Sequence, residues 1–230
     1  MTITILSSAL SLNKTMRRDL EEMTPVDINL YKTANLPENK KFSKARIEDS
    51  RKTMVQTLEE NGFDMNNLKD VVEIPIYATN ELTWKDTLSP VYDEVKKQFP
   101  NLLYETAEEL VKASDYNKVA RLYGTTEYEL NDNEYVILCD FDNMTELRNK
   151  ALKADSTITI GGKEYKSKYD ECQEGYLYMA ASHINSGIII VPDSCNLTEN
   201  MKEETFLAAN YNANTEKEKE EIEKIFKVLD

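Results

Sequence analysis

Hydrophobic and polar residues recur with two different periods in the first third of the chain. Alternation over residues 26–31 predicts a strand. Three-to-four-residue spacing over 43–61 predicts a helix, with Gly62 as a signal for its C-terminal cap. Residues 71–77, VVEIPIY, predict a second strand, in which Pro75 indicates an edge position or a bulge. We therefore expect a strand–helix–strand unit with both strands in one sheet and the helix on a face.

The rest of the chain mixes the same two periods. Helical spacing predicts helices at 88–98, 104–113, 115–123 and 145–154. Alternation predicts strands at 127–130, 135–140, 176–181, 187–191 and 204–211, the first two paired around the turn at 131–133. Ser114 is a candidate N-cap and Gly124 a stop signal. The sequence TITIGGKEYK predicts a hairpin around Gly161 and Gly162. Together these elements define an α+β domain.

The first 24 residues follow neither pattern throughout. The first 13 carry no charge and are apolar or small on every side, unlike an amphipathic helix at a protein surface. From residue 12 onward, apolar residues recur at helical spacing among charged ones, and Pro25 stops the helix. A complete span needs about 20 apolar residues, and this uncharged stretch is shorter. We therefore expect residues 1–24 to be a stalk helix that continues a transmembrane span.

The C-terminal residues mirror this arrangement. Thr215 is a candidate N-cap, Glu216 and Glu218 lie in the first predicted turn, and apolar residues from Ile222 onward form a stripe. We expect residues 213–230 to be a second stalk helix leading to the next span. The alternative is that both terminal segments are ordinary helices of the globular core.

Composition narrows the class of partner. The chain has 42 acidic and 28 basic residues and a formal net charge of −14. Such a charge repels nucleic-acid phosphates, so we expect no nucleic-acid partner. The acidic excess also suits the extracellular side of a membrane, because basic residues concentrate on the inner side.

The cysteines and the one histidine do not suggest a metal or catalytic centre. Cys139, Cys172 and Cys195 are far apart in sequence and contain no CxxC pair, so a zinc site with His183 is not predicted. An odd number leaves at least one thiol free or paired between chains, and Cys139, in an apolar run, is expected to be buried. No nucleophile elbow accompanies His183. We expect no catalytic residue, metal or cofactor.

One acidic group begins like a calcium-binding loop. It contains Asp140, Asp142 and Asn143. Thr145 and Ala151 occupy the positions where such a loop needs its glycine and its last glutamate. A calcium site is therefore not favoured.

Three other features each have a functional and a structural interpretation. Gly161, Gly162 and Lys163 contain a GK pair, but the spacing of a phosphate-binding loop is missing and a hairpin explains them better. Trp84 is either an exposed anchor for a partner or a half-buried residue at a junction of lobes. The acidic run at 216–223 is most simply a solvated helix face.

Several segments together resemble a known family. They are LSSALSLNKTMRRDL, SDYNKVARLYG followed by YELNDNEYVI, NSGIIIVPDS, and FLAANYNANTEKEKEEIEKIF. In their content and order they resemble the large extracellular domain of FtsX-like (MacB-like) ABC transporter permeases of Gram-positive bacteria. The similarity extends over essentially the whole chain. It consists of packing and turn patterns and includes no catalytic motif.

The resemblance implies a membrane location, with this domain on the extracellular side between the first two transmembrane helices of a permease. The implied partners are a cytoplasmic ATP-binding subunit, a second permease in a dimer or pseudo-dimer, and an extracellular peptide, lipid or lipoprotein. The implied fold is a split α/β lobe over 25–212 with an inserted second lobe at about 81–175. The substrate-binding residues are not indicated.

Two other classes of protein are alternatives. A secreted or surface-anchored binding module would also explain the acidity and the lack of catalytic motifs. A small hydrolase is the enzyme alternative, but the sequence contains no coherent catalytic constellation. Our expectation is that the domain is not an enzyme.

Overall fold

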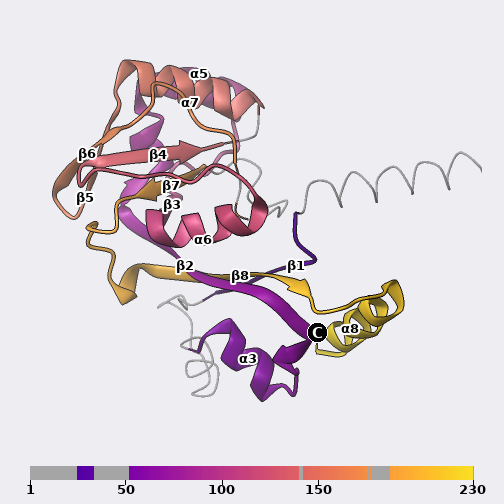
Figure 1. The fold of residues 1–230 in the computed structure, drawn as a ribbon. Helices are drawn as coiled ribbons and strands as arrows, with labels where there is room; N and C mark the ends of the chain where they lie inside the picture. Colours follow the sequence, from indigo (N-terminus) through magenta and orange to yellow (C-terminus); the bar gives the residue numbers. More distant parts are fainter. Residues whose placement is uncertain (1–24, 34–51, 140–141, 176, 178–186, 230) are drawn as a thin grey trace, which may run out of the picture.

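The computed structural model describes residues 25–33, 52–139, 142–175, 177 and 187–229, and these residues have the predicted α+β class (Figure 1). Eight strands are described: β1 (Ile28–Thr33), β2 (Leu68–Thr83), β3 (Ala107–Lys112), β4 (Glu134–Leu138), β5 (Thr157–Ile160), β6 (Lys163–Ser167), β7 (Ile188–Val191) and β8 (Lys202–Tyr211). The described α-helices are α3 (Met54–Glu60), α4 (Trp84–Thr87), α5 (Tyr92–Gln98), α6 (Ala113–Tyr123), α7 (Asp142–Ala154) and α8 (Glu216–Leu229). Short 3-10 turns lie at η1 (Met65–Asn67), η2 (Ser89–Val91) and η4 (Glu199–Met201).

All eight described strands form one mixed sheet in the order β1-β8-β2-β3-β7-β4-β6-β5. The last strand, β8, lies between β1 and β2 and is antiparallel to both. The first two strands therefore run parallel in one sheet, as the predicted strand–helix–strand unit requires, with β8 inserted between them.

Strand β2 connects the two halves of the sheet. Residues Leu68 to Tyr77 pair with β8, and Tyr77 to Thr83 pair with β3 on the other side. The register of the β2–β8 pair shifts between Ile76 and Tyr77, directly after Pro75. The prediction of an edge position for Pro75 is wrong, because β2 is an interior strand. Pro75 itself pairs in register with Thr205, so the irregularity lies next to the proline and not at it.

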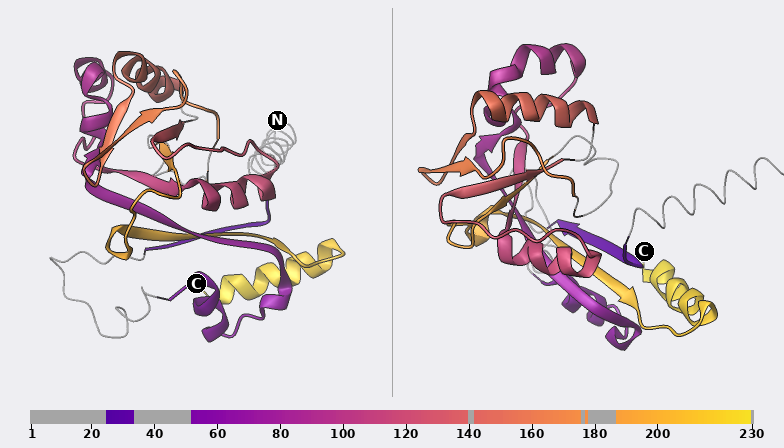
Figure 2. Two further views of the ribbon diagram at one scale, coloured as in Figure 1. Left: turned by 60° about the vertical axis from the view of Figure 1, so that its left-hand side comes forward. Right: turned by 45° about the horizontal axis from the view of Figure 1, so that its top comes forward.

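Alternating residues of the sheet are buried on its two opposite faces. In β8, Phe206 and Ala208 pack with α6, while Leu207 and Ala209 pack with α3 and α8. In the views of Figures 1 and 2, α6 lies on the opposite side of the β1–β8–β2 layer from α3 and α8, and α5 and α7 lie over the far half of the sheet. The molecule thus has a helix layer on each side of a central sheet.

Several local predictions are confirmed. Helix α3 has Asn61 as its C-cap and Gly62 at φ +83°, and α6 ends at Gly124 with φ +69°. The hairpin β5–β6 turns at Gly161 and Gly162, both with positive φ, which glycine adopts without steric cost. The predicted strands at 187–191 and 204–211 correspond to β7 and β8.

The N-terminus of α8 is also as predicted. Glu218 N donates to Thr215 Oγ1 at 3.2 Å, and Thr215 N donates to Glu218 Oε2 at 3.2 Å, which is a capping box. Glu216 and Glu218 lie in the first turn, where negative charge is favourable.

The helix predicted at 104–113 is wrong. Residues Ala107 to Lys112 form strand β3, in which Leu110 and Val111 are fully buried between α6 on one face and β5 and β6 on the other. The spacing of Ala107, Leu110 and Val111 fits a helix, but strand β3 extends the sheet between β2 and β7 and its residues are buried on both faces. Tertiary pairing therefore determines the conformation here.

Two predictions near α6 are also wrong. Residues 127–130 form no strand: Asn117 Nδ2 donates to Tyr128 O at 2.9 Å, and Tyr128 N donates to Asn117 Oδ1 at 2.8 Å. The Asn117 side chain thus takes the hydrogen bonds that a neighbouring strand would offer to the Tyr128 backbone. Strand β4, which was predicted to pair with 127–130, pairs with β6 and β7 instead. Ser114 is not the N-cap of α6, which is Lys112; Ser114 N donates to Asp193 Oδ1 at 3.1 Å.

Some predictions fall outside the described residues. These are the stalk helix at 1–24, residues 43–51 of the helix predicted at 43–61 and nearly all of the strand at 176–181. Within the described part, the helix predicted at 43–61 begins only at Met54, because Thr53 is its N-cap and has an extended backbone. Among the residues that the structure does describe, none of the helices is long and apolar enough to cross a membrane.

Candidate functional site

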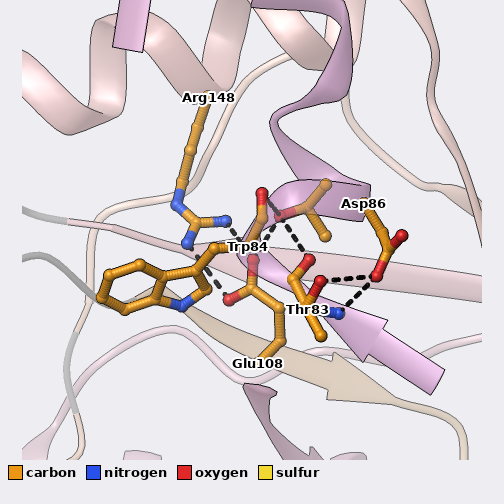
Figure 3. Close-up of polar contacts among 6 residues, drawn as sticks. Thr83, Trp84, Asp86, Glu108 and Arg148 are labelled. Atoms are coloured by element: carbon orange, nitrogen blue, oxygen red, sulfur yellow. Dashed lines mark hydrogen bonds and ion pairs between the residues drawn. The ribbon is translucent and has the colours of Figure 1, made fainter. Parts of the chain in front are cut away.

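A buried ion pair joins β3 to α7. Arg148 Nη1 donates to Glu108 Oε1 at 2.9 Å, and Arg148 Nη2 donates to Glu108 Oε2 at 3.1 Å (Figure 3). The exposed fractions of these side chains are 1% for Arg148 and 0% for Glu108. The two-pronged geometry matches the planar guanidinium to the planar carboxylate and fixes the orientation of both.

Helix α4 contributes a third element to this site. Thr87 Oγ1 donates to Glu108 Oε1, so the carboxylate binds α4 as well as α7. The start of α4 is held by its own cap, since Thr83 N and Thr83 Oγ1 both donate to Asp86 Oδ2 at 2.7 Å (Figure 3). One carboxylate of the central sheet therefore positions two helices.

The Glu108 carboxylate favours the charged form of Arg148. Burial by itself lowers the pKa of Arg148, but the adjacent Glu108 carboxylate and its hydrogen bonds outweigh burial and hold that pKa above its usual range. Neither charged group is accessible to a substrate, and the carboxylate is occupied by three donors. The arrangement therefore suits the positioning of α4 and α7, not general acid–base chemistry.

Two buried donors next to the pair remain without an acceptor. Arg148 Nε and Trp84 Nε1 have no hydrogen-bond partner within the described part of the chain. A small cavity of about 20 Å³ lies beside Arg148, and its polar lining includes Asp86, Tyr135, Asp155 and Thr157.

The three cysteines are all free thiols. Cys139 is 4% exposed, as predicted, and Cys195 is also buried, whereas Cys172 is half-buried. Burial raises the pKa of Cys172 to about 12, although Arg148 opposes the shift. Because the thiolate is the nucleophilic form, Cys172 is unreactive near neutral pH.

The residues considered from the sequence do not assemble into one site. His183 and Asp140 lie outside the described residues. Asp142 is the first residue of α7, so the positions that follow it are helical and do not form a calcium loop. Lys163 opens β6 directly after the hairpin turn.

Trp84 is buried, with an exposed fraction of 8%, and it packs with Leu88, Val95 and Met144 in the cluster under α5 and α7. Of the two interpretations of Trp84, the exposed anchor for a partner is therefore wrong, and the side chain is buried more deeply than the half-buried interpretation expected. The residue instead contributes to the packing of α4 with α5 and α7.

The Glu108–Arg148 pair was not predicted from the sequence. Glu108 lies in a segment rich in acidic residues that was predicted to be a helix with a solvated face. Nothing in the local sequence distinguishes Glu108 from the other acidic residues there. Arg148 does carry a signal, because it is four residues from both Met144 and Leu152, on the apolar stripe of α7. A charged residue on an apolar stripe indicates a buried partner.

A second, larger hollow lies beside α8. This groove has a volume of about 290 Å³ and is lined by Asn67, Asn212, Asn214, Glu218, Glu221, Ile222 and Ile225. Its lining is mostly polar, and Ile225 is 42% exposed within it.

The fold and the buried pair define an α+β domain with a mixed eight-stranded sheet over the described residues. No family model matches the chain, and no curated protein or solved structure is significantly similar to it.

Proposed function

We propose that this chain is a non-catalytic extracellular domain of an ABC transporter permease of the FtsX-like (MacB-like) kind. In this proposal the domain lies between two membrane-spanning helices and couples motion driven by a cytoplasmic ATP-binding subunit to an extracellular peptide, lipid or lipoprotein. The resemblance of its sequence segments is one support. The arrangement of the two ends of the described domain is the other.

The observation that carries the proposal is the contact between the segment before β1 and the segment after β8. Tyr211 N donates to Asp27 Oδ2 at 2.9 Å, and Asp27 forms an ion pair with Lys219 of α8. Ile28 is directly opposite Ala209 in the β1–β8 pair. A domain inserted between two neighbouring membrane helices needs its entry and exit side by side, and this geometry meets that need.

The same contact suggests how motion would reach the domain. Helix α8 buries Ile222 against the cluster formed by β1, β8 and α3, and Lys219 ties it to Asp27. A displacement of α8 would therefore act directly on the β1–β8–β2 layer. Strand β2 continues into the second half of the sheet, where it pairs with β3.

A secreted or surface-anchored binding module is the second candidate. The groove of about 290 Å³ beside α8 favours it, because asparagine and glutamate side chains there offer hydrogen bonds to a polar ligand. This candidate requires neither membrane spans nor an ATP-binding partner.

The test expresses the complete gene that encodes this chain in a Gram-positive host, with the substitution Asn196→Cys. Asn196 is exposed, whereas Cys139 and Cys195 are buried and Cys172 has a raised pKa, so the unsubstituted protein is a matched control of low reactivity. A membrane-impermeant maleimide is applied to intact cells, and the protein is then purified in detergent.

We expect labelling of the variant in intact cells and co-purification with an ATP-binding subunit. Labelling only after lysis would contradict the extracellular location. Labelled protein without any ATP-binding partner would favour the binding module.

A further inference from the structure

The groove beside α8 lies between one face of this helix and a set of asparagines. The helix contributes four lining residues at the three-to-four-residue spacing of a single face, namely Glu218, Glu221, Ile222 and Ile225. The other lining residues come from the end of η1 and the segment after β8, namely Asn67, Asn212 and Asn214. The volume of about 290 Å³ is at the lower end of the roughly 300–1,000 Å³ of small-molecule sites, so the groove has room for one ring-sized molecule.

Hydrogen bonds hold both sides of the groove in place. Asn212 N donates to Asn67 O at 2.8 Å, and Asn212 Nδ2 donates to Asn66 O at 3.0 Å. At the start of α8, Glu218 Oε2 accepts from Asn214 N at 2.7 Å. A ligand would therefore enter a groove that is already formed, which lowers the ordering cost of binding.

Several polar side chains of the lining are not used by the protein itself. Among the described residues, the side chains of Asn67, Asn214 and Glu221 have no hydrogen-bond or ion-pair partner. An asparagine amide offers donors and an acceptor, and a carboxylate accepts. Next to them, Ile222 and the 42% exposed Ile225 provide apolar surface.

We propose that this groove binds a sugar. One pyranose ring would place its C–H face on Ile222 and Ile225 and its hydroxyls among the free polar side chains. A hydroxyl both donates and accepts, so it can pair with an amide or with a carboxylate. An acyl chain would leave the polar groups of the lining without partners, and a peptide of several residues is too long for the volume.

The charges of the groove favour one kind of sugar. Both charged lining residues are acidic, and no lysine or arginine of the described chain lines the groove. Glu218 caps α8, whereas Glu221 is free to pair with a cation. An amino sugar with an ammonium group is therefore favoured over a neutral sugar, and an acidic sugar is repelled. This inference deepens the binding-module candidate, on which it rests for a polar ligand, and does not require the permease.

The experiment titrates the ¹⁵N-labelled chain with three sugars that share one ring and differ in charge: glucosamine, glucose and glucuronate. Spectra are recorded at about pH 6, where the glucosamine ammonium is protonated and the carboxylates are ionised. We expect saturable shifts of signals from Asn67, Asn214 and Ile225 with glucosamine, weaker binding of glucose, and no binding of glucuronate.

Neighbouring residues of α8 supply a matched pair of variants. Glu221 lines the groove, whereas the exposed Glu220 does not. Glu221→Gln should weaken glucosamine binding about two- to fivefold, as for an exposed ion pair, and leave glucose binding unchanged. Glu220→Gln should change neither.

A cation without the ring separates sugar binding from attraction by charge alone. N-acetyl-lysine amide carries an ammonium and a peptide group but no hydroxyls. Binding as tight as that of glucosamine would overturn the proposal, and so would the absence of saturable shifts at the groove with all three sugars. The titration needs neither a membrane nor an ATP-binding subunit, so failure of sugar binding and failure of the permease proposal are separate results.

Discussion

Glu108 and Arg148 form an ion pair in which both side chains are almost completely buried. Removal of one member of a buried pair leaves the other charge without a partner and strongly lowers the free energy of unfolding. Replacement of both members by apolar residues of similar volume, in contrast, is often neutral or stabilising. Because Glu108 also accepts from Thr87, its loss would loosen α4 as well as α7.

We therefore expect Glu108→Gln to lower the free energy of unfolding by about 3–5 kcal/mol. Urea unfolding followed by circular dichroism measures it. The matched control is Glu171→Gln, which removes the exposed pair with Lys153, where both side chains are more than half accessible. The control should cost less than about 1 kcal/mol. Equal effects of the two substitutions would show that the buried pair has no special role.

Cys172 gives a prediction for alkaline pH. Burial raises the pKa of its thiol from the ordinary 9.0 to about 12. Between these values the unfolded chain releases the proton while the folded chain keeps it, so the unfolded state binds fewer protons and stability falls as pH rises. We expect Cys172→Ala to reduce this alkaline slope, measured by urea unfolding across that pH range. An unchanged slope would mean that the thiol titrates alike in both states.

At the scale of single elements, the docking of α8 depends on Asp27. This carboxylate accepts from Tyr211 N and pairs with Lys219. Asp27→Ala should cost about 1–2 kcal/mol and increase hydrogen exchange in α8 more than elsewhere. Glu220→Ala, an exposed change on the same helix, is the control and should leave exchange unchanged. Uniform loss of protection across the domain would contradict a local role for Asp27.

The segment at 127–130 depends in the same way on Asn117. Its side chain makes two hydrogen bonds with the backbone of Tyr128. Asn117→Ala would leave these backbone groups without their partner, so we expect a loss of about 1–3 kcal/mol in thermal or urea unfolding. Lys118→Ala, an exposed neighbour, should be nearly neutral. If the two substitutions were equivalent, the side chain would not be what supports this segment.

Local signals in the sequence predicted many of the elements, and the errors have specific physical causes. The hairpin at Gly161 and Gly162 and the cap at Gly124 need a backbone conformation that glycine favours, so the residue type reveals them. Strand β3 was predicted as a helix because the apolar spacing fits both structures and its pairing with β7 involves residues about 80 positions away. Long-range pairing has no local signature.

The same error concealed the candidate site. Glu108 in a helix would be one of several solvated acids, but in β3 it faces Arg148, 40 residues away in sequence. Only half of the pair has a sequence signal, namely Arg148 on the apolar stripe of α7. The groove beside α8 likewise combines residues from η1, the loop after β8 and α8, which the sequence does not bring together.

At the scale of the whole molecule, the segments before β1 and after β8 lie together. Asp27 contacts Tyr211 and Lys219, so the segments before β1 and after β8 share one attachment point. The net charge of −14 agrees with a domain that does not bind nucleic acid. Neither the Asp27 contacts nor the net charge involves a catalytic group.

The most direct test of the permease account is the genomic sequence on both sides of the segment that encodes this chain. We predict apolar stretches of about 20 residues in frame on both sides, each long enough to span a membrane, and a neighbouring frame that encodes an ATP-binding subunit. A reading frame that encodes this domain without such stretches, and without an ATP-binding neighbour, would contradict the account.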